Sequence, residues 1–251
     1  MEKAFDTMDD TPTTGDLRPP LLLLPGTACD RRVFAPLIER LGDYPILIGD
    51  MAGARTMPDL AEIILANAPP YFLLAGFSLG GICALEMVAR QPQRIGGLAL
   101  IDTTARPDPP ANAAVRRKAV ADAYEKGMDG FILDAWPRLV SAANVGDEAL
   151  RDTIVAMARD CGPGRLEEQA EVAIHRADSR PRLSAITQPT LVVAGMHEAV
   201  CPPDIQKEMA EAIAVAELHF IADAGHFAPL EQPDAMALHV QRWLASIVSP
   251  N

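Results

Sequence analysis

Short apolar runs recur along this chain of 251 residues, each bounded by Gly or Pro and followed by a longer amphipathic segment. A strand that is apolar on both faces must be covered on both sides, which is typical of a parallel sheet between two layers of helices. Strands that alternate with helices in this way predict a doubly wound, mostly parallel α/β sheet with right-handed crossovers. The six predicted strands cover residues 21–25, 45–50, 71–77, 95–102, 189–195 and 217–221.

The amphipathic segments between these runs have helical spacing, and two of them carry helix boundary signals. The segment after the third run ends at Pro92, because proline cannot continue a helix. The segment after the fifth run begins with Pro202 and Pro203, which suit the first turn of a helix. These helices are predicted over residues 31–41, 58–67, 79–91, 202–214 and 233–247.

One stretch interrupts the alternation of strands and helices. From about Arg106 to Ile186 the sequence has helical patterns and no convincing strand. Some eighty residues are too many for a simple crossover between neighbouring strands, so we predict an inserted helical cap. The predicted division of the chain is a polar leader at 1–18, an α/β core at 19–104 and 187–251, and a cap at 105–186.

The charge balance limits the partners that this chain can have. Its formal net charge is −12, whereas a surface for nucleic acid or an anionic membrane needs a basic footprint, so we expect neither partner. The acidic N-terminal segment MEKAFDTMDD has no apolar stretch of the signal-peptide type. The longest pure apolar run, Leu21 to Leu24, is too short to cross a bilayer. These features predict a soluble cytoplasmic protein.

The cysteines are scattered and show neither a CxxC pattern nor the spacing of metal ligands. This usage does not suggest bridged pairs and favours reduced, buried thiols. We expect no metal site from them. The four cysteines are Cys29, Cys83, Cys161 and Cys201.

The segment GFSLGG places Ser78 between glycines, directly after an apolar run and directly before a helix. This is the setting of a nucleophile elbow, a strained strand-to-helix turn that exposes a serine hydroxyl. Small residues two positions before and after the serine relieve steric clashes in such a turn. The positive end of the following helix favours negative charge that develops at the serine. We therefore predict that Ser78 is a nucleophile.

A serine hydroxyl needs a base to take its proton, and the base needs an acid to orient it. His226 follows the last predicted strand at a Gly turn, which places it at the same sheet edge as Ser78. We predict that His226 is the base. The other histidines are expected to be structural or loop residues: His175 in the cap, His197, His219 in a strand and His239 in the last helix.

Two carboxylates are the main candidates for the orienting acid, and Asp204 and Asp223 are weaker ones. Glu198 lies in the loop after the run PTLVVAG, and Asp102 ends the run LALID. Both follow strands, and ligands of open α/β sheets bind at the carboxyl ends of the strands. The chain order Ser78, Glu198, His226 agrees with the order of such sites, so we favour Glu198 and keep Asp102 as the alternative.

The segments GFSLGG, VVAGMHEAVCPP and DAGHFAPLEQP, together with the helical insertion, resemble the α/β-hydrolase superfamily. Within it, these motifs resemble those of small bacterial carboxylesterases of the pimeloyl-ACP methyl ester esterase type. The resemblance implies an α/β-hydrolase fold, with Ser78, His226 and Glu198 as the catalytic triad. It also implies an oxyanion hole formed by the N–H of Leu79 and one from the loop after the first strand, at Thr27 or Ala28.

This chain departs from the pattern of the family at two positions. Pro25 stands where the first loop usually has His, and Glu198 stands where the acid is usually Asp. The oxyanion donor in that loop is a main-chain N–H, so Thr27 can still supply it. The longer Glu198 side chain requires a loop backbone that lies farther from His226.

The expected activity is hydrolysis of a carboxylic ester, or of a thioester or lactone, through an acyl-enzyme and without a cofactor. The expected partner is a small-molecule ester, and the protein is expected to be a monomer or homodimer. Phe131 and Trp136 are predicted to line an acyl pocket, and Met128 and Met157 are further candidates. The alternative, which their helical spacing favours, is that these side chains pack in the core of the cap. Because the cap shows no cluster of Lys or Arg that faces one way, the acyl group is expected to be apolar or moderately polar. The alternatives to an ester hydrolase are a C–C bond hydrolase, an enzyme for another cofactor-free reaction and a non-catalytic binding protein.

Overall fold

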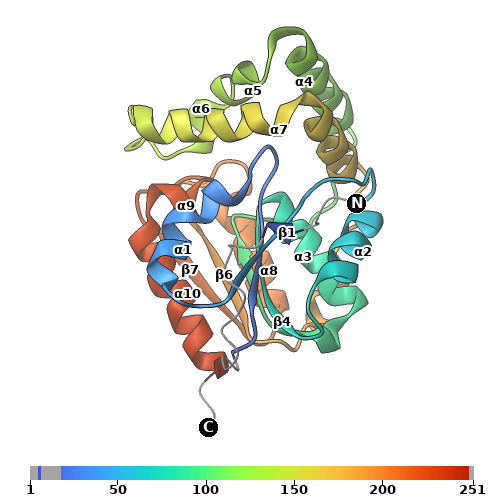
Figure 1. Ribbon diagram of the computed structural model, residues 1–251, viewed down its shortest axis with the longest axis vertical. Helices are drawn as coiled ribbons and strands as arrows, with labels where there is room; N and C mark the ends of the chain where they lie inside the picture. Colours follow the sequence, from blue (N-terminus) through green and yellow to red (C-terminus); the bar gives the residue numbers. More distant parts are fainter. Residues whose placement is uncertain (1–4, 7–17, 249–251) are drawn as a thin grey trace.

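A seven-stranded sheet lies at the centre of the protein, whose computed structural model describes residues 5–6 and 18–248 (Figure 1). The strands, in chain order, are β1 (Phe5–Asp6), β2 (Leu21–Leu24), β3 (Ile46–Gly49), β4 (Phe72–Phe77), β5 (Ile95–Ile101), β6 (Thr190–Gly195) and β7 (Ala216–Ile221). Their order across the sheet is β1-β3-β2-β4-β5-β6-β7. Every neighbouring pair except β1 and β3 is parallel. The predicted α/β class and all six predicted strands are confirmed.

The additional strand β1 pairs antiparallel with β3 at one edge of the sheet, with Phe5 opposite Gly49. The acidic sequence around β1 shows no strand pattern. An edge strand does not need such a pattern, because it can pair with the open backbone N–H and C=O groups of its neighbour. The rest of the predicted leader, apart from Arg18, lies outside the described residues.

Helices cover both faces of the sheet, as the doubly wound prediction requires (Figure 1). One face carries α1 (Ala35–Leu41) and α10 (Pro233–Val248). The other carries α2 (Met57–Asn67), α3 (Leu79–Arg90) and α8 (Pro203–Ala212). Shorter helices connect these elements: η1 (Arg31–Phe34), η2 (Pro92–Arg94), η3 (Arg180–Ala185) and α9 (Ala228–Glu231).

The two faces of the sheet contribute to two separate hydrophobic cores. In β2, Leu21 and Leu23 pack with the core around α1 and α10. Leu22 and Leu24 pack with the core around α2, α3 and α8. Successive residues of a strand point to opposite faces, so a strand covered on both sides must be apolar at every position.

Between β5 and β6 the described chain contains helices and no strand. Figure 1 shows α4 (Asn112–Lys126), α5 (Asp129–Leu133), α6 (Trp136–Leu139) and α7 (Glu148–Ile174) beyond one end of the sheet. We call α4 to α7 the helical layer. Gly162, with φ 71°, and Pro163 divide α7 into two straight parts. None of the described helices is both long and apolar enough to cross a membrane.

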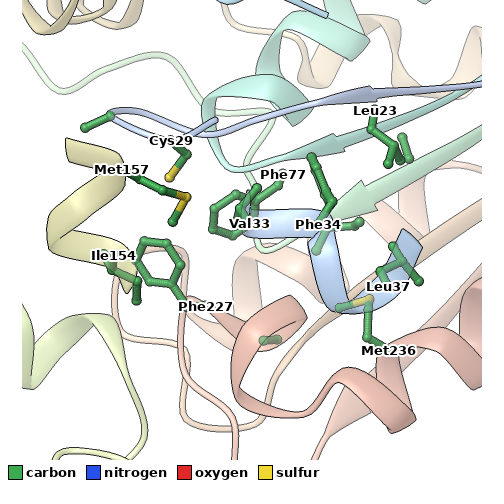
Figure 2. Close-up of a cluster of buried hydrophobic side chains, with 14 of the residues drawn as sticks. Leu23, Cys29, Val33, Phe34, Leu37, Phe77, Ile154, Met157, Phe227 and Met236 are labelled. Atoms are coloured by element: carbon green, nitrogen blue, oxygen red, sulfur yellow. The ribbon is translucent and has the colours of Figure 1, made fainter. Parts of the chain in front are cut away.

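The helical layer shares a hydrophobic core with the sheet. Figure 2 shows Ile154 and Met157 of α7 near Cys29 and Phe227, which come from loops after β2 and β7. Met157 has no exposed surface, and Ile154 is 1% exposed. This packing fixes α7 over the carboxyl ends of the strands.

We expect the substitution Gly80→Ala to destabilise the protein strongly. A Cβ atom at this position would lie 2.0 Å from the carbonyl oxygen of Leu24, and backbone atoms of β2 cannot move aside alone. The free energy of unfolding, measured by urea denaturation, should fall by at least about 2 kcal/mol. Gly130→Ala in α5 is the control, because nothing lies within 4 Å of its Cβ position. Equal urea midpoints for the two variants would contradict this close approach of α3 to β2.

Candidate active site

Ser78 lies in a sharp turn between β4 and α3. Its backbone has φ 52° and ψ −115°, a conformation that costs free energy in a non-glycine residue. Two contacts hold the turn: the Ser78 N–H donates to Ile101 O at 2.9 Å, and the Thr103 hydroxyl donates to Ser78 O at 2.7 Å. Gly76 is required here, because a Cβ atom on it would lie 2.3 Å from the carbonyl oxygen of Gly80.

His226 lies in the loop between β7 and α9, next to Ser78. Its Nε2 is 3.0 Å from Ser78 Oγ, and its Nδ1 is 2.5 Å from Glu198 Oε2. The ring is 5.1 Å from that of Phe77 and 5.8 Å from that of Phe227, measured between centroids. The three predicted residues therefore lie together, and they come from the carboxyl ends of three parallel strands.

Glu198 is held in the turn after β6 and has no exposed side-chain surface. Its Oε1 accepts a hydrogen bond from the N–H of Val200 at 2.5 Å. Burial alone would raise the pKa of this carboxyl, but His226 and the N–H groups of Val200 and Cys201 outweigh burial and hold the pKa below its usual value. An ionised Glu198 favours the proton of the imidazole on Nδ1, which leaves Nε2 as an acceptor toward Ser78.

Asp102, the alternative acid, has a different environment. It is fully buried, its Oδ1 accepts from the Gly195 N–H at 2.8 Å, and its Oδ2 has no hydrogen-bond partner among the described residues. Burial, and then the nearby charge of Glu198, raise the pKa of Asp102 well above its usual value. Among the described residues it makes no hydrogen bond to His226, so the geometry favours Glu198 as the partner of the imidazole.

The loop after β2 presents its backbone N–H groups near Ser78. The N–H of Ala28 donates to Gln169 Oε1 at 2.9 Å and is not free to bind a ligand. Within the described residues, the N–H groups of Thr27 and Leu79 have no hydrogen-bond acceptor. Thr27 and Leu79 both line the same cavity as Ser78. Of the two N–H groups predicted from the first loop, that of Thr27 is available.

Gln169 was not identified from the sequence, although it connects α7 to two loops of the core. Its Nε2 donates to Met51 O at 3.1 Å, while its Oε1 accepts from Ala28. The side chain is buried in the middle of a polar helix. No local pattern predicts this role, because the two backbone groups that it binds are more than 100 positions away in the chain.

Glu231 is a second residue that the sequence did not reveal. Its Oε1 accepts from the N–H of Gly225 at 2.8 Å, and its Oε2 accepts from the N–H of Ser141 at 2.7 Å and from Asn144 Nδ2 at 2.9 Å. It therefore ties the loop of His226 to the helical layer. A buried Glu three residues after an Ala-Pro helix start is the only local signal.

A cavity of about 570 Å³ lies over Ser78 and His226. Phe131, one of the two predicted substrate contacts, lines this cavity. Trp136 does not: it is buried in the helical layer, and its Nε1 donates to Val145 O at 2.9 Å. Met128 and Met157 are likewise packed in the core and are absent from the cavity wall.

The cavity wall carries more basic residues than we predicted from the sequence of the cap. Four arginines and one aspartate line it beside His226, although the sequence indicated no cluster of basic residues that faces one way. These arginines are far apart in the sequence and come together only in the fold. The four are Arg106, Arg116, Arg138 and Arg176.

The remaining histidines do not line this cavity, whereas Cys29 and Cys201 do. His219 and His239 stack with ring centroids 4.3 Å apart, and His175 pairs with Glu171. All four cysteines are free thiols. Among residues 5–6 and 18–248, no group of three or more His, Cys, Asp or Glu is placed to hold a metal ion.

An imidazole within hydrogen-bond reach of a hydroxyl and a buried carboxylate can take the proton of that hydroxyl. The model of the alpha/beta hydrolase family matches residues 21–238. The chain belongs to the alpha/beta hydrolase family. The resemblance to this superfamily inferred from the motifs is confirmed.

Relatives of this hydrolase have different substrates in their names. It is 30% identical to a pimeloyl-acyl-carrier-protein methyl ester esterase of Xanthomonas oryzae pv. oryzae, over 91% of this chain and 96% of the relative. A thermophilic esterase of Thermogutta terrifontis, solved with malate bound, is 27% identical with a TM-score of 0.85, over 92% of this chain and 91% of that one. An enol-lactonase of Burkholderia xenovorans LB400 is 25% identical with a TM-score of 0.83, over 96% of this chain and 95% of that one.

For this hydrolase, Glu198→Gln should lower kcat far more than Asp102→Asn. The neutral amide cannot stabilise an imidazolium that forms at His226, and losses of this kind reach roughly 10⁴-fold. Asp102→Asn should lower kcat less than about 10-fold, because among the described residues Asp102 makes no hydrogen bond to His226 or Ser78. The kcat of each variant is measured by steady-state ester hydrolysis. Each variant must first show the same thermal unfolding as the wild type. The reverse ranking would assign the acid to Asp102.

Proposed function

We propose that this protein is a serine hydrolase that cleaves a carboxylic ester, or a related thioester or lactone, through an acyl-enzyme. The observation that carries the proposal is the position of His226 between Ser78 Oγ and Glu198 at the floor of a cavity. The names of the relatives, two esterases and an enol-lactonase, support the same class of bond.

In the proposed first step, Ser78 Oγ attacks the carbonyl carbon of the ester while His226 Nε2 takes the hydroxyl proton. The proton then passes from Nε2 to the leaving alcohol as the carbon–oxygen bond breaks, which leaves an acyl group on Ser78. A water molecule repeats both steps and releases the acid. Glu198 stabilises the positive charge that forms on the imidazole in each step. The lowered pKa of Glu198 supports this role, because only the ionised carboxylate can stabilise that charge.

The carbonyl oxygen becomes negative in the tetrahedral intermediate, and two N–H groups are available for it. One belongs to Leu79 at the start of α3, where the helix dipole also favours negative charge. The other belongs to Thr27, since Gln169 occupies the N–H of Ala28. Each donor of this kind typically contributes about 10²-fold or more to the rate.

We further propose that the helical layer acts as a cap that shapes the acyl site. It supplies Phe131, Ile132 and Leu166 to the cavity wall, while the core supplies Phe77 and Phe227. A cavity covered in this way excludes bulk water and strengthens the electrostatic interactions at Ser78. The proposed substrate is a small molecule, handled without a metal or organic cofactor.

Replacement of Ser78 by Ala should abolish both ester hydrolysis and covalent labelling by a fluorophosphonate. The probe reacts only with an activated serine, so labelling of the wild type would also exclude a non-catalytic binding protein. The readouts are mass spectrometry of the labelled peptide and release of p-nitrophenol from p-nitrophenyl butyrate. The substitution should leave thermal unfolding close to wild type. Undiminished turnover in the folded variant would refute the assignment of the nucleophile.

Phe131→Ala should shift the preferred acyl length of p-nitrophenyl esters toward longer chains. Removal of the ring enlarges the cavity on the side of α5, and a methylene that fills such space contributes about 1–3 kcal/mol to discrimination. Leu133→Ala is the matched control: Leu133 lies in the same helix but is 46% exposed and does not line the cavity. An identical length profile in both variants would show that α5 does not set acyl length.

A further inference from the structure

A partly buried ionic cluster forms part of the wall of the active-site cavity. It consists of Arg116 from α4, Asp108 from the segment before α4, and Arg176 from the segment after α7, and we call these three residues the arginine cluster. All three line the cavity that contains Ser78 and His226. The side chains of Asp108 and Arg176 are 2% and 7% exposed, and that of Arg116 is 32% exposed.

Asp108 is shared between the two guanidinium groups. Arg116 binds it through two hydrogen bonds, from Nε to Oδ2 at 2.8 Å and from Nη2 to Oδ1 at 3.0 Å. Arg176 Nη1 lies 2.9 Å from Oδ1, and its Nε donates to Arg106 O at 2.9 Å. Although burial alone would raise the pKa of Asp108, Arg116 and then Arg176 outweigh burial and hold the pKa below its usual value.

The cluster has more positive than negative charge. Two guanidinium groups face one carboxylate, and no other carboxylate pairs with Arg116 or Arg176 among the described residues. Arg116 Nη1 and Arg176 Nη2 make no hydrogen bond in the described part of the chain. By contrast, Arg106 is neutralised by Glu208 at 2.7 Å. The cluster therefore has both an unbalanced charge and unused donors.

An excess positive charge in a partly buried site favours the binding of an anion that compensates it. This local excess of positive charge contrasts with the formal net charge of the whole chain, which is −12. An arginine pair presents planar donors that match the geometry of a carboxylate. Apolar side chains of Ile82 and Val120 line the same cavity and suit a short hydrocarbon chain.

We propose that the arginine cluster is a subsite for a carboxylate that the ester substrate carries away from its scissile bond. The natural substrates would then be half-esters of dicarboxylic acids or esters of hydroxy acids, and not the uncharged esters expected from the sequence of the cap. This inference rests on the proposed ester hydrolysis at Ser78. It differs from that proposal in assigning the specificity to charge recognition.

The test compares matched pairs of esters that differ only in one carboxylate. On the acyl side the pair is p-nitrophenyl valerate and mono-p-nitrophenyl glutarate, and on the alcohol side it is phenyl butyrate and 4-butyryloxybenzoate. The wild type should have a higher kcat/KM for the anionic member of at least one pair. The pair that shows the preference identifies whether the acyl or the alcohol portion reaches the cluster.

Arg116→Gln is the decisive variant, because Asp108 keeps Arg176 as a partner and only the excess charge is lost. The kcat/KM for the preferred anionic ester should fall about 10-fold or more, mainly through KM, with the neutral ester within about twofold of wild type. Arg116→Lys should retain part of the preference. Arg117→Gln is the control: Arg117 is the next residue of α4, pairs with Glu171 and does not line the cavity.

The outcomes separate this inference from the proposed function. No preference for either anionic ester in the wild type, or an equal loss for both members of a pair in Arg116→Gln, would overturn the subsite and leave ester hydrolysis intact. If no ester is hydrolysed and Ser78 is not labelled by the fluorophosphonate, the proposed function fails instead. The subsite is then tested by calorimetric titration with glutarate, which should bind the wild type and bind Arg116→Gln at least about 10-fold more weakly. Absence of glutarate binding to the wild type would overturn it.

Discussion

The parallel pairing of β2, β4, β5, β6 and β7 is the constraint on which the site depends, because parallel strands end at the same edge of a sheet. Ser78, Glu198 and His226 follow β4, β6 and β7, and Thr27 follows β2. Residues nearly 150 positions apart therefore meet without any long-range signal in the sequence. The close approach of α3 to β2 at Gly80 then sets the direction in which Ser78 faces.

The electrostatic environment of the site depends on which buried carboxylates are paired. Glu198 is in contact with an imidazole and with backbone N–H groups, so its pKa is low and it stays ionised. Asp102 is nearby but lacks such partners, and its pKa is raised. Two negative charges close together in a buried site repel each other, and this repulsion adds to burial in raising the pKa of Asp102. The pKa values of two carboxyl groups at one sheet edge are thus shifted in opposite directions.

Much of the arrangement could be predicted from the sequence because its signals are local. The apolar runs specify strands, and the glycines around Ser78 specify the turn. Trp136 shows the limit of such reasoning: helical spacing identified a buried face but not whether that face met the cavity or the interior of the helical layer. Gln169, Glu231 and the arginine cluster were missed for a different reason, because their partners are supplied by segments that are distant in the sequence.

Gln169 and Glu231 also affect whether the helical layer can be exchanged between members of the family. Gln169 reaches from α7 to Ala28 and Met51 of the core. Glu231 reaches from the core to Ser141 and Asn144 next to the helical layer. A chimera that exchanged the helical layer for that of another family member would remove one end of each bridge. The oxyanion loop and the histidine loop would lose their supports together, so a graft intended to change specificity would have to carry these bridging residues with it.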